Sequence, residues 1–169
     1  AAGNPLPERV DVAVIGSGYT GLHAALQTAR AGRSTLVVDA EDAGWGCSSR
    51  NGGQISTSIK PGFDVLAQRH GEERARAILL EGQRSLAWVG EFVGAERIDC
   101  DFRVVGRFHA AHNATQFTSL VRRLAEQPKG LEVDAQVVPR AEQRAELGTD
   151  AYWGGVVYLG HASIDPARY

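Results

Sequence analysis

The fold is decided by residues 10–39, which read VDVAVIGSGYTGLHAALQTARAGRSTLVVD. Residues 10–15 form a short apolar run of the kind found in buried strands, and residues 22–31 form an Ala-rich run typical of a helix. A second apolar run follows at residues 35–38 and ends at an acidic residue, Asp39. A strand, a helix and a second strand in this order predict a Rossmann-like βαβ unit, the start of an α/β fold.

Three glycines between the first strand and the helix match the pattern G-x-G-x-x-G. In that pattern Gly16 permits the tight turn, Gly18 lets the backbone approach a pyrophosphate, and Gly21 lets the helix pack closely on the strand. The free N–H groups and positive dipole end of the helix would face the phosphates. Asp39 is placed to accept hydrogen bonds from ribose hydroxyls, so the unit predicts a site for the ADP half of a dinucleotide. An acid with no Arg beside it disfavours NADP and leaves NAD and FAD open.

The overall composition is that of an ordinary globular protein. The chain has 169 residues, of which 43% are hydrophobic and 22% charged, and its formal net charge is −2. The length suits one domain of ordinary size, and the small charge gives no reason to expect a nucleic-acid or anionic-membrane partner. No apolar run is long enough for a membrane span.

The cysteines and the N-terminal residues indicate the cellular compartment of the protein. Only two cysteines occur, Cys47 and Cys100, which are too few for a disulfide framework. The N-terminal residues lack the basic and apolar regions of a secretory signal. These features predict a cytoplasmic setting. Because the chain contains no Met, we expect either a processed start or a piece of a longer protein.

A long loop rich in Gly and Ser follows the second strand, at residues 40–62. Long loops inside compact domains are usually functional or disordered. Ser48 and Ser49 offer hydroxyl donors, and Arg50 offers a cationic fork that suits phosphate. The loop glycines let the backbone pass close to a flat or charged ligand: Gly44, Gly46, Gly52 and Gly53.

Two segments together resemble a known family. They are DVAVIGSGYTGLHAAL at residues 11–26 and GWGCSSRNGGQI at residues 44–55. This combination resembles the FAD-dependent amine and amino-acid oxidoreductases of the D-amino-acid oxidase type, and most closely their gamma-glutamylputrescine oxidase-like branch, which carries G-W-G-A-S-G-R-N-G-G-Q. The chain differs from that motif by Cys47 in place of Ala and Ser49 in place of Gly. Looser similarity at residues 98–101 and 152–169 extends the match along the N-terminal part of the family, whose members are more than twice this long.

The resemblance implies FAD as the cofactor, because a lone NAD dehydrogenase has no need for the second loop. It implies that the glycine turn holds the ADP moiety, that Ser48 and nearby amides serve the phosphates, and that residues 50–55 approach the flavin ring or its ribityl chain. The family usually has Glu where this chain has the shorter Asp39. The cofactor-binding residues expected on this basis are Gly16, Ser17, Gly18, Tyr19, Thr20, Gly21, Asp39, Ala40, Gly46, Cys47, Ser48, Arg50, Asn51, Gly52, Gly53, Gln54 and Ile55.

The resemblance also implies a reaction, the oxidation of the C–N bond of a small-molecule amine or amino acid. A hydride equivalent would pass to the flavin, the resulting imine would hydrolyse, and electrons would reach oxygen, giving hydrogen peroxide, or another acceptor. No catalytic residue is assigned, because substrate-recognising residues of the family lie largely beyond this segment. Two alternatives stay open: a catalytically incompetent dinucleotide-binding fragment of such an enzyme, and an NAD-dependent dehydrogenase.

The rest of the chain predicts helices and antiparallel strands after the βαβ start. We expect helices at 72–93, 114–126 and 139–147, a strand–turn–strand at 102–110, and a strand with a glycine bulge at 153–159. This pattern predicts a division into residues 1–62, the N-terminal part of an FAD-binding domain, and residues 63–169, the start of an α+β substrate domain. His109 and His112 lack a completing ligand set, so no metal site is predicted.

Overall fold

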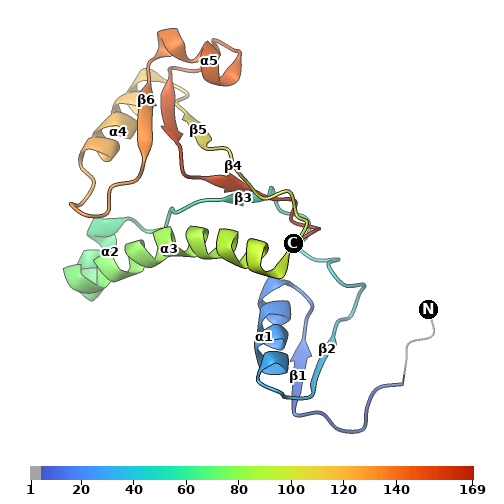
Figure 1. Cartoon of the computed structure of the whole chain (residues 1–169). Coiled ribbons are helices and arrows are strands. Elements are labelled where there is room, and N and C mark those ends of the chain that lie inside the picture. Colours follow the sequence, from blue (N-terminus) through green and yellow to red (C-terminus); the bar gives the residue numbers. More distant parts are fainter. Residues whose placement is uncertain (1–4) are drawn as a thin grey trace. The chain divides into compact units, whose positions relative to one another are not determined.

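The structure is a computed structural model, and it describes residues 5–169 (Figure 1). The chain divides into two compact units. The first runs up to Gly52 and also contains Pro166–Tyr169, and the second is Gly53–Asp165. The chain therefore returns to its first unit at its last four described residues. The functional division at residue 62 stays a prediction.

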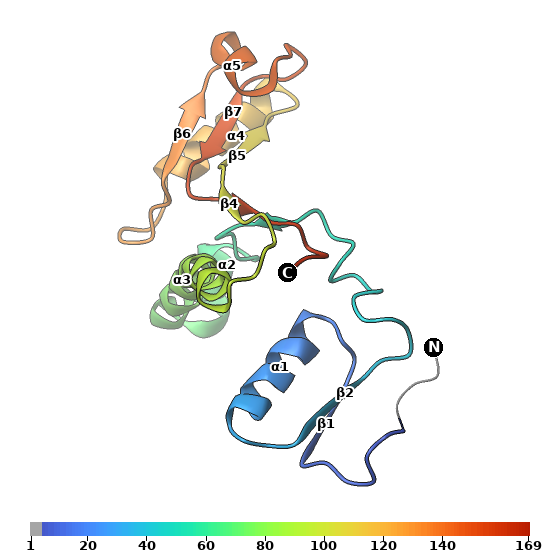
Figure 2. The ribbon, with the colours of Figure 1, turned by 45° about the vertical axis from the view of Figure 1, so that its right-hand side comes forward.

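The first unit contains the expected βαβ arrangement. Strand β1 (Val12–Ile15) pairs in parallel with β2 (Thr35–Val38), and helix α1 (Tyr19–Arg30) connects them. Figure 2 shows α1 lying along this pair of strands. Helix α1 begins before the expected residue 22, because the extended backbone of Gly18 already serves as its N-cap. The two apolar runs form the strands, but the burial expected for the first run is not found: β1 alternates between half-buried and exposed residues, and Ile15 is 89% exposed.

The second unit begins with a short strand and a pair of helices. Strand β3 (Gln54–Ile55) is followed by α2 (Phe63–His70) and the long helix α3 (Glu72–Glu96). Gly71 separates the helices with a φ of +83°, a left-handed conformation that favours glycine. Helix α3 confirms the periodicity seen at residues 72–93. Strand β3 lies inside the loop expected at residues 40–62, and α2, which the sequence did not predict, follows that loop.

Two small antiparallel sheets complete the second unit. The first has the strand order β3–β8–β4, where β4 is Arg103–Val104 and β8 is Ala162–Ser163. The second has the order β5–β7–β6. Its strands are β5 (Arg107–Ala110), β6 (Ala135–Val138) and β7 (Gly155–Tyr158). The antiparallel α+β character expected for this part of the chain is confirmed.

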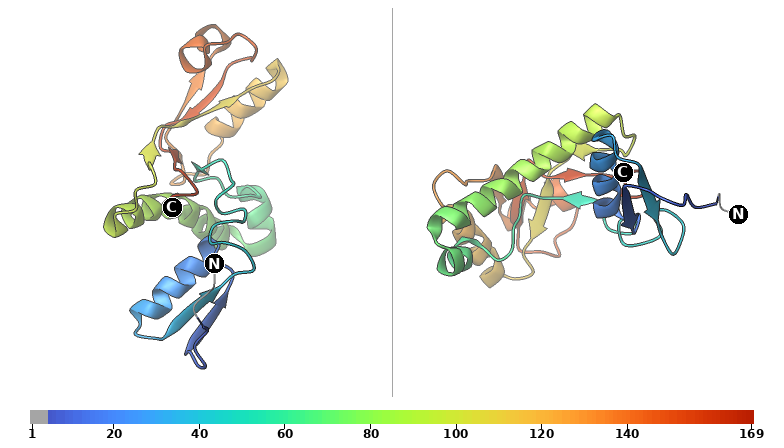
Figure 3. Two further views of the ribbon diagram at one scale, coloured as in Figure 1. Left: turned by 90° about the vertical axis from the view of Figure 1, so that its right-hand side faces the viewer. Right: turned by 90° about the horizontal axis from the view of Figure 1, so that it is seen from below.

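Helix α4 (Ala114–Ala125) covers one face of the β5–β7–β6 sheet, as Figure 3 shows. The centre of this packing consists of Ala111, Leu120 and Val156, all buried. Strand β7 passes so close to β5 that a Cβ on Gly155 would lie 2.3 Å from the carbonyl oxygen of His109. The expected short helix appears as a 3₁₀ turn, Arg140–Glu142, followed by α5 (Arg144–Leu147). Within residues 5–169, no helix has both the length and the apolar character needed to cross a bilayer.

Candidate dinucleotide site

The glycine turn of the first unit has the tight geometry that its sequence predicts. Gly16 has a φ of +102°, and its amide donates to the carbonyl oxygen of Val38 over 2.7 Å. A Cβ on Gly21 would lie 2.0 Å from the carbonyl oxygen of Gly16, so helix α1 can pack this closely only with glycine there. The turn therefore brings the N-terminus of α1 to the ends of β1 and β2.

Side chains already bind some of the amides at the start of α1. The amide of Tyr19 donates to Ser48 Oγ over 3.0 Å. The amide and the hydroxyl of Ser17 each donate to Asp39 Oδ2 over 2.6 Å. Among the described residues, the amides of Thr20 and Gly21 have no partner. These two donors, at the positive end of the helix dipole, give the turn its capacity to bind a phosphate.

Asp39 is an exposed anion fixed at the end of β2. Its pKa is lowered from 3.8 to about 2, chiefly by the hydroxyl of Ser17, next by the Ser17 amide and then by the amide of Glu41. The Glu41 amide donates to Oδ1 over 3.3 Å. Ser17 therefore occupies Oδ2, and Oδ1 carries the weaker contact. The expected contact between Asp39 and a ribose stays a prediction.

The loop that follows β2 is held by its own hydrogen bonds. Asn51 Nδ2 donates to the carbonyl oxygens of Ser48 over 2.8 Å and Cys47 over 3.4 Å. The hydroxyl of Ser49 donates to the carbonyl oxygens of Gly44 and Gly46. These contacts fix the backbone around Ser48, the residue whose hydroxyl caps α1. The loop is thus ordered against the glycine turn, and it brings Ser48 and Asn51 to that turn.

Arg50 and Cys47 lie away from the hydrogen bonds of the turn. The Arg50 guanidinium carbon lies 4.3 Å from the centroid of the Trp45 ring, a cation–π arrangement. Both Arg50 and the Cys47 thiol are exposed. An Arg on an aromatic ring keeps most of its N–H donors available, so the expected contact of Arg50 with a cofactor stays a prediction.

The last three expected cofactor residues belong to the second unit. Gly53 is buried, with a φ of +65°, and its carbonyl oxygen accepts from the amide of Ile164 over 2.9 Å. Gln54 and Ile55 form β3, which pairs with β8. Thus the structure gathers the glycine turn, Asp39 and the Ser48 loop in the first unit, and orders Gly53, Gln54 and Ile55 separately in the second.

The C-terminal segment contributes contacts to α1 that sequence reasoning missed. The hydroxyl of Tyr19 donates to the carbonyl oxygen of Pro166 over 2.8 Å. His23 Nε2 and the hydroxyl of Tyr169 are 2.8 Å apart, and the Tyr169 ring packs edge-on against Tyr19 at 5.0 Å between centroids. The partners are about 146 residues apart in the chain, so no local sequence signal could have paired them.

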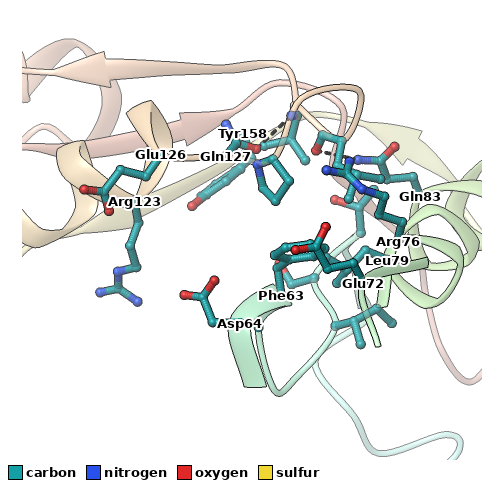
Figure 4. Close-up of a pocket in the computed structure, with 17 residues that line it drawn as sticks. Phe63, Asp64, Glu72, Arg76, Leu79, Gln83, Arg123, Glu126, Gln127 and Tyr158 are labelled. Carbon is teal, nitrogen blue, oxygen red and sulfur yellow. Dashed lines mark hydrogen bonds between the residues drawn. The ribbon is translucent and has the colours of Figure 1, made fainter. Parts of the chain in front are cut away.

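The second unit also contains an open cavity of about 650 Å³ (Figure 4). It lies beside α2, α3 and α4, and Figure 4 shows Tyr158 of β7, Arg123 of α4 and Asp64 of α2 around it. Arg76 also lines the cavity, and it donates to the carbonyl oxygen of Lys129 over 2.8 Å. None of the expected cofactor residues lines this cavity.

Comparison with known proteins identifies the family. Residues 11–169 match DAO, the family of FAD dependent oxidoreductases. The chain belongs to this family. FAD is the cofactor of its members, which decides between FAD and NAD in favour of FAD. Within residues 5–169, no cluster of His, Cys, Asp or Glu side chains is suited to hold a metal ion.

Individual relatives agree with this assignment. The chain is 32% identical over 159 residues to a gamma-glutamylputrescine oxidoreductase of Escherichia coli, a match that covers 92% of this chain and 36% of that protein. Its structure superposes on glycine oxidase from Geobacillus kaustophilus with a TM-score of 0.78 and 17% identity, covering 95% of this chain and 42% of that one. L-amino acid deaminase from Proteus vulgaris gives a TM-score of 0.69 at 21% identity, covering 98% and 41%. The two solved structures show a shared fold, and the chain spans well under half of each relative.

Proposed function

We propose that the protein to which these residues belong is an FAD-dependent oxidoreductase that oxidises the C–N bond of an amine or amino acid. Family membership supports the cofactor and the reaction class. The names of the relatives support the choice of a C–N bond as the bond that is oxidised. The E. coli relative is named for gamma-glutamylputrescine, and the structural relatives are named for glycine and for L-amino acids. The common element of these substrates is a carbon that bears nitrogen.

The geometry at the start of α1 is the main support for placing the diphosphate of FAD there. The amides of Thr20 and Gly21 lack partners in the described residues, while a Cβ on Gly21 would overlap the Gly16 backbone. A diphosphate fits this arrangement, because it can accept from the open amides at the positive helix end without displacing a side chain. We assign Gly16–Gly21, Asp39, Ala40, Gly46, Cys47 and Ser48 to the ADP and pyrophosphate.

We assign residues 50–55 to the flavin ring and ribityl chain. Gly53 has a left-handed backbone and Gln54 and Ile55 are ordered in β3, so this segment offers backbone groups in fixed positions. Bound FAD would supply the two-electron acceptor for the C–N bond and pass the electrons to oxygen or to another acceptor. The protein's part is to hold and orient the reactants. The imine product would then hydrolyse in water.

The first experiment is a visible absorption spectrum of the purified full chain, followed by anaerobic addition of candidate substrates. Bound flavin would give bands near roughly 370 and 450 nm, and an oxidisable substrate would bleach the longer-wavelength band. Glycine, longer L- and D-amino acids and gamma-glutamyl amines form the test set. The matched controls are hydroxy acids of the same carbon skeletons, which offer a C–O bond in place of C–N.

The outcomes test separately the bond that is oxidised, the electron acceptor and the turnover of the flavin. Bleaching by an amine or amino acid, with hydrogen peroxide formed once air is admitted, supports C–N oxidation with oxygen as acceptor. Bleaching by hydroxy acids alone would refute the C–N assignment while leaving a flavin oxidoreductase. A flavin that no member of either set bleaches would favour a cofactor-binding segment without turnover of its own.

A further inference from the structure

A buried histidine of the second unit stands directly beside the segment assigned to the flavin. His161 is 3% exposed and immediately precedes β8. Strand β8 is the central strand of its sheet, and it pairs with β3 on one side and β4 on the other. The position of β8 therefore determines where Gln54 and Ile55 lie within the unit.

The imidazole of His161 makes a second connection to the same segment. Its Nε2 lies 3.3 Å from the hydroxyl of Thr57, two residues beyond β3. Its backbone carbonyl oxygen accepts from the amide of Gly106 over 2.9 Å. The ring is stacked on Tyr158, with 5.0 Å between centroids and 12° between planes. His161 thus joins the residues that follow β3 to the ends of β5 and β7.

Thr57 is confined on its other side by helix α3. A Cβ on Gly82 would lie 3.0 Å from the carbonyl oxygen of Thr57 and 2.5 Å from Ile59 Cγ1. The chain after β3 therefore lies close to α3 at Gly82 and contacts the His161 ring through the Thr57 hydroxyl. A segment held on both sides has little freedom to move unless one of these contacts is lost.

The surroundings of His161 favour the neutral imidazole. Its pKa is lowered, first by burial and then by the positive charge of Arg107, whose guanidinium lies 5.2 Å from the Tyr158 centroid. His161 Nδ1 is buried and has no partner among the described residues. The acids that face this site, Glu132 and Asp134, lie on the wall of a small cavity that His161 also borders.

We propose that His161 is a positioning residue, which through Thr57 and the β3–β8 pairing sets the position of Gln54 and Ile55 against the flavin. The proposal rests on the cofactor placement given above. It assigns His161 no contact with substrate and no proton transfer. Its effect on the flavin arises because a two-residue strand has few hydrogen bonds of its own, so that the contact with Thr57 makes up a large share of what fixes it.

The test uses four variants of the full chain, each loaded with FAD. His161→Phe keeps a ring for Tyr158 and removes the contact with Thr57, and Thr57→Val removes the hydroxyl at constant size. Thr57→Ser keeps the hydroxyl and is the conservative control. His109→Phe is the matched control for a partly buried histidine elsewhere in the unit, since His109 of β5 also has a lowered pKa and its strand pairs with β7.

The expected result is a change in both the flavin spectrum and its affinity. His161→Phe and Thr57→Val should each weaken FAD binding by about three- to tenfold, and the double variant should bind no more weakly than the poorer single variant, because both remove one shared contact. Thr57→Ser and His109→Phe should match the parent. The flavin band of the parent should also shift as the pH falls below 6.5, the ordinary pKa of histidine, as His161 gains a proton, and this shift should be absent from His161→Phe.

Different failures point to different errors. A spectrum and affinity of Thr57→Val equal to those of the parent would overturn the inference, and this variant remains informative if His161→Phe does not fold. Gln54→Ala separates the inference from the proposed function. If Gln54→Ala alters the flavin spectrum and His161→Phe does not, the positioning role is wrong and the cofactor placement stands. If neither alters the spectrum, β3 does not reach the flavin and both are wrong.

Discussion

At the level of single residues, Asp39 at the end of β2 has a structural role of its own, besides any contact it makes with a ligand. Asp39 Oδ2 accepts both the amide and the hydroxyl of Ser17, so the carboxylate braces the glycine turn. An Asp is short enough to stay at the turn, whereas a Glu would reach farther from the strand.

Replacing this acid should weaken cofactor binding. Asp39→Asn keeps the size of the side chain and removes its charge, so the charge-assisted bonds from Ser17 become ordinary ones and the turn loses rigidity. We expect FAD to bind about tenfold more weakly, measured by quenching of flavin fluorescence. Asp39→Glu keeps the charge and is the control: it should bind FAD more tightly than Asp39→Asn, and no more tightly than the parent. Equal affinity of the parent and Asp39→Asn would show that the carboxylate contributes nothing to the site.

The lowered pKa of Asp39 also predicts a pH dependence of stability. The folded-state pKa is about 2 against an ordinary value of 3.8, so the folded state holds the anion more firmly than the unfolded chain does. The stabilisation is present above pH 3.8 and is lost as the pH falls towards about 2. Urea unfolding followed from pH 5 downwards should show a shallower loss for Asp39→Asn than for the parent. Parallel curves would contradict the assignment.

Gly21 is a position where the structure leaves no room for a side chain. A Cβ there would lie 2.0 Å from a backbone oxygen, which cannot rotate away as a side chain could. Gly21→Ala should cost about 1–3 kcal/mol of unfolding free energy, because the backbone must shift, and it should abolish FAD binding. The control is Gly94→Ala in α3, where a Cβ meets nothing within 4 Å and the helix should gain stability. Normal FAD binding by Gly21→Ala would contradict the close packing of α1.

At the level of elements, the sequence predicts helices and strands with a clear apolar pattern, and it does not predict the shortest strands. Strand β2 has the bounds expected from its apolar run, and α3 and α4 begin at the expected residues. The strands β3 and β8 have two residues each, too few to show alternation. They exist because β8 pairs with segments that precede it in the chain by more than fifty residues.

Helix α2 and strand β6 were missed for other reasons. Helix α2 has eight residues and an N-cap glycine that makes no side-chain hydrogen bond, so it gives no start signal apart from the glycine itself. Strand β6 has four residues, AQVV, in which exposed Val137 precedes buried Val138. Its place is set by β7, with which it pairs in antiparallel register.

The candidate site divides in the same way. The glycine pattern and Asp39 were evident from local sequence, and the tight turn was predicted from them. The bond from Tyr19 to Ser48 was not predicted, because it depends on how the loop folds back onto the start of α1. The bonds from Ser17 to Asp39 were not predicted either, because they depend on how β1 and β2 pair. Local chemistry therefore predicts which residues can bind a phosphate, and tertiary contacts determine which of their donors remain available.

The N-cap of α4 offers a test at the level of one element. Asn113 Oδ1 accepts from the amide of Gln116 over 2.8 Å, and Gln116 Oε1 accepts from the amide of His112 over 2.7 Å. Asn113→Ala leaves the first of these amides unpaired, so we expect unfolding free energy to fall by about 1 kcal/mol in urea titrations. Asn113→Asp restores an acceptor and should recover most of the loss. An unchanged midpoint for Asn113→Ala would show that α4 is held by its packing alone.

At the level of the whole molecule, the chain leaves the first unit at Gly52 and re-enters it at Pro166. The βαβ unit is therefore completed by residues from two distant parts of the sequence. Tyr19 lies where these parts meet, because its hydroxyl donates to Pro166 and lies 3.5 Å from Asn51 Nδ2. A residue inside the glycine pattern thus connects the start of α1 to both the second loop and the returning chain.

Removing that hydroxyl should loosen the returning segment before it affects the turn itself. Tyr19→Phe keeps the ring contact with Tyr169 and deletes the bond to Pro166, so we expect a loss of about 1 kcal/mol and faster amide exchange at residues 166–169. Tyr152→Phe is the control, since the described residues include no partner for that hydroxyl and its ring contact with His112 is retained. If exchange rises equally in β1 and β2, the returning segment and the βαβ core unfold as one cooperative unit. Unchanged exchange throughout would mean that the hydroxyl of Tyr19 contributes nothing to holding the two parts of the unit together.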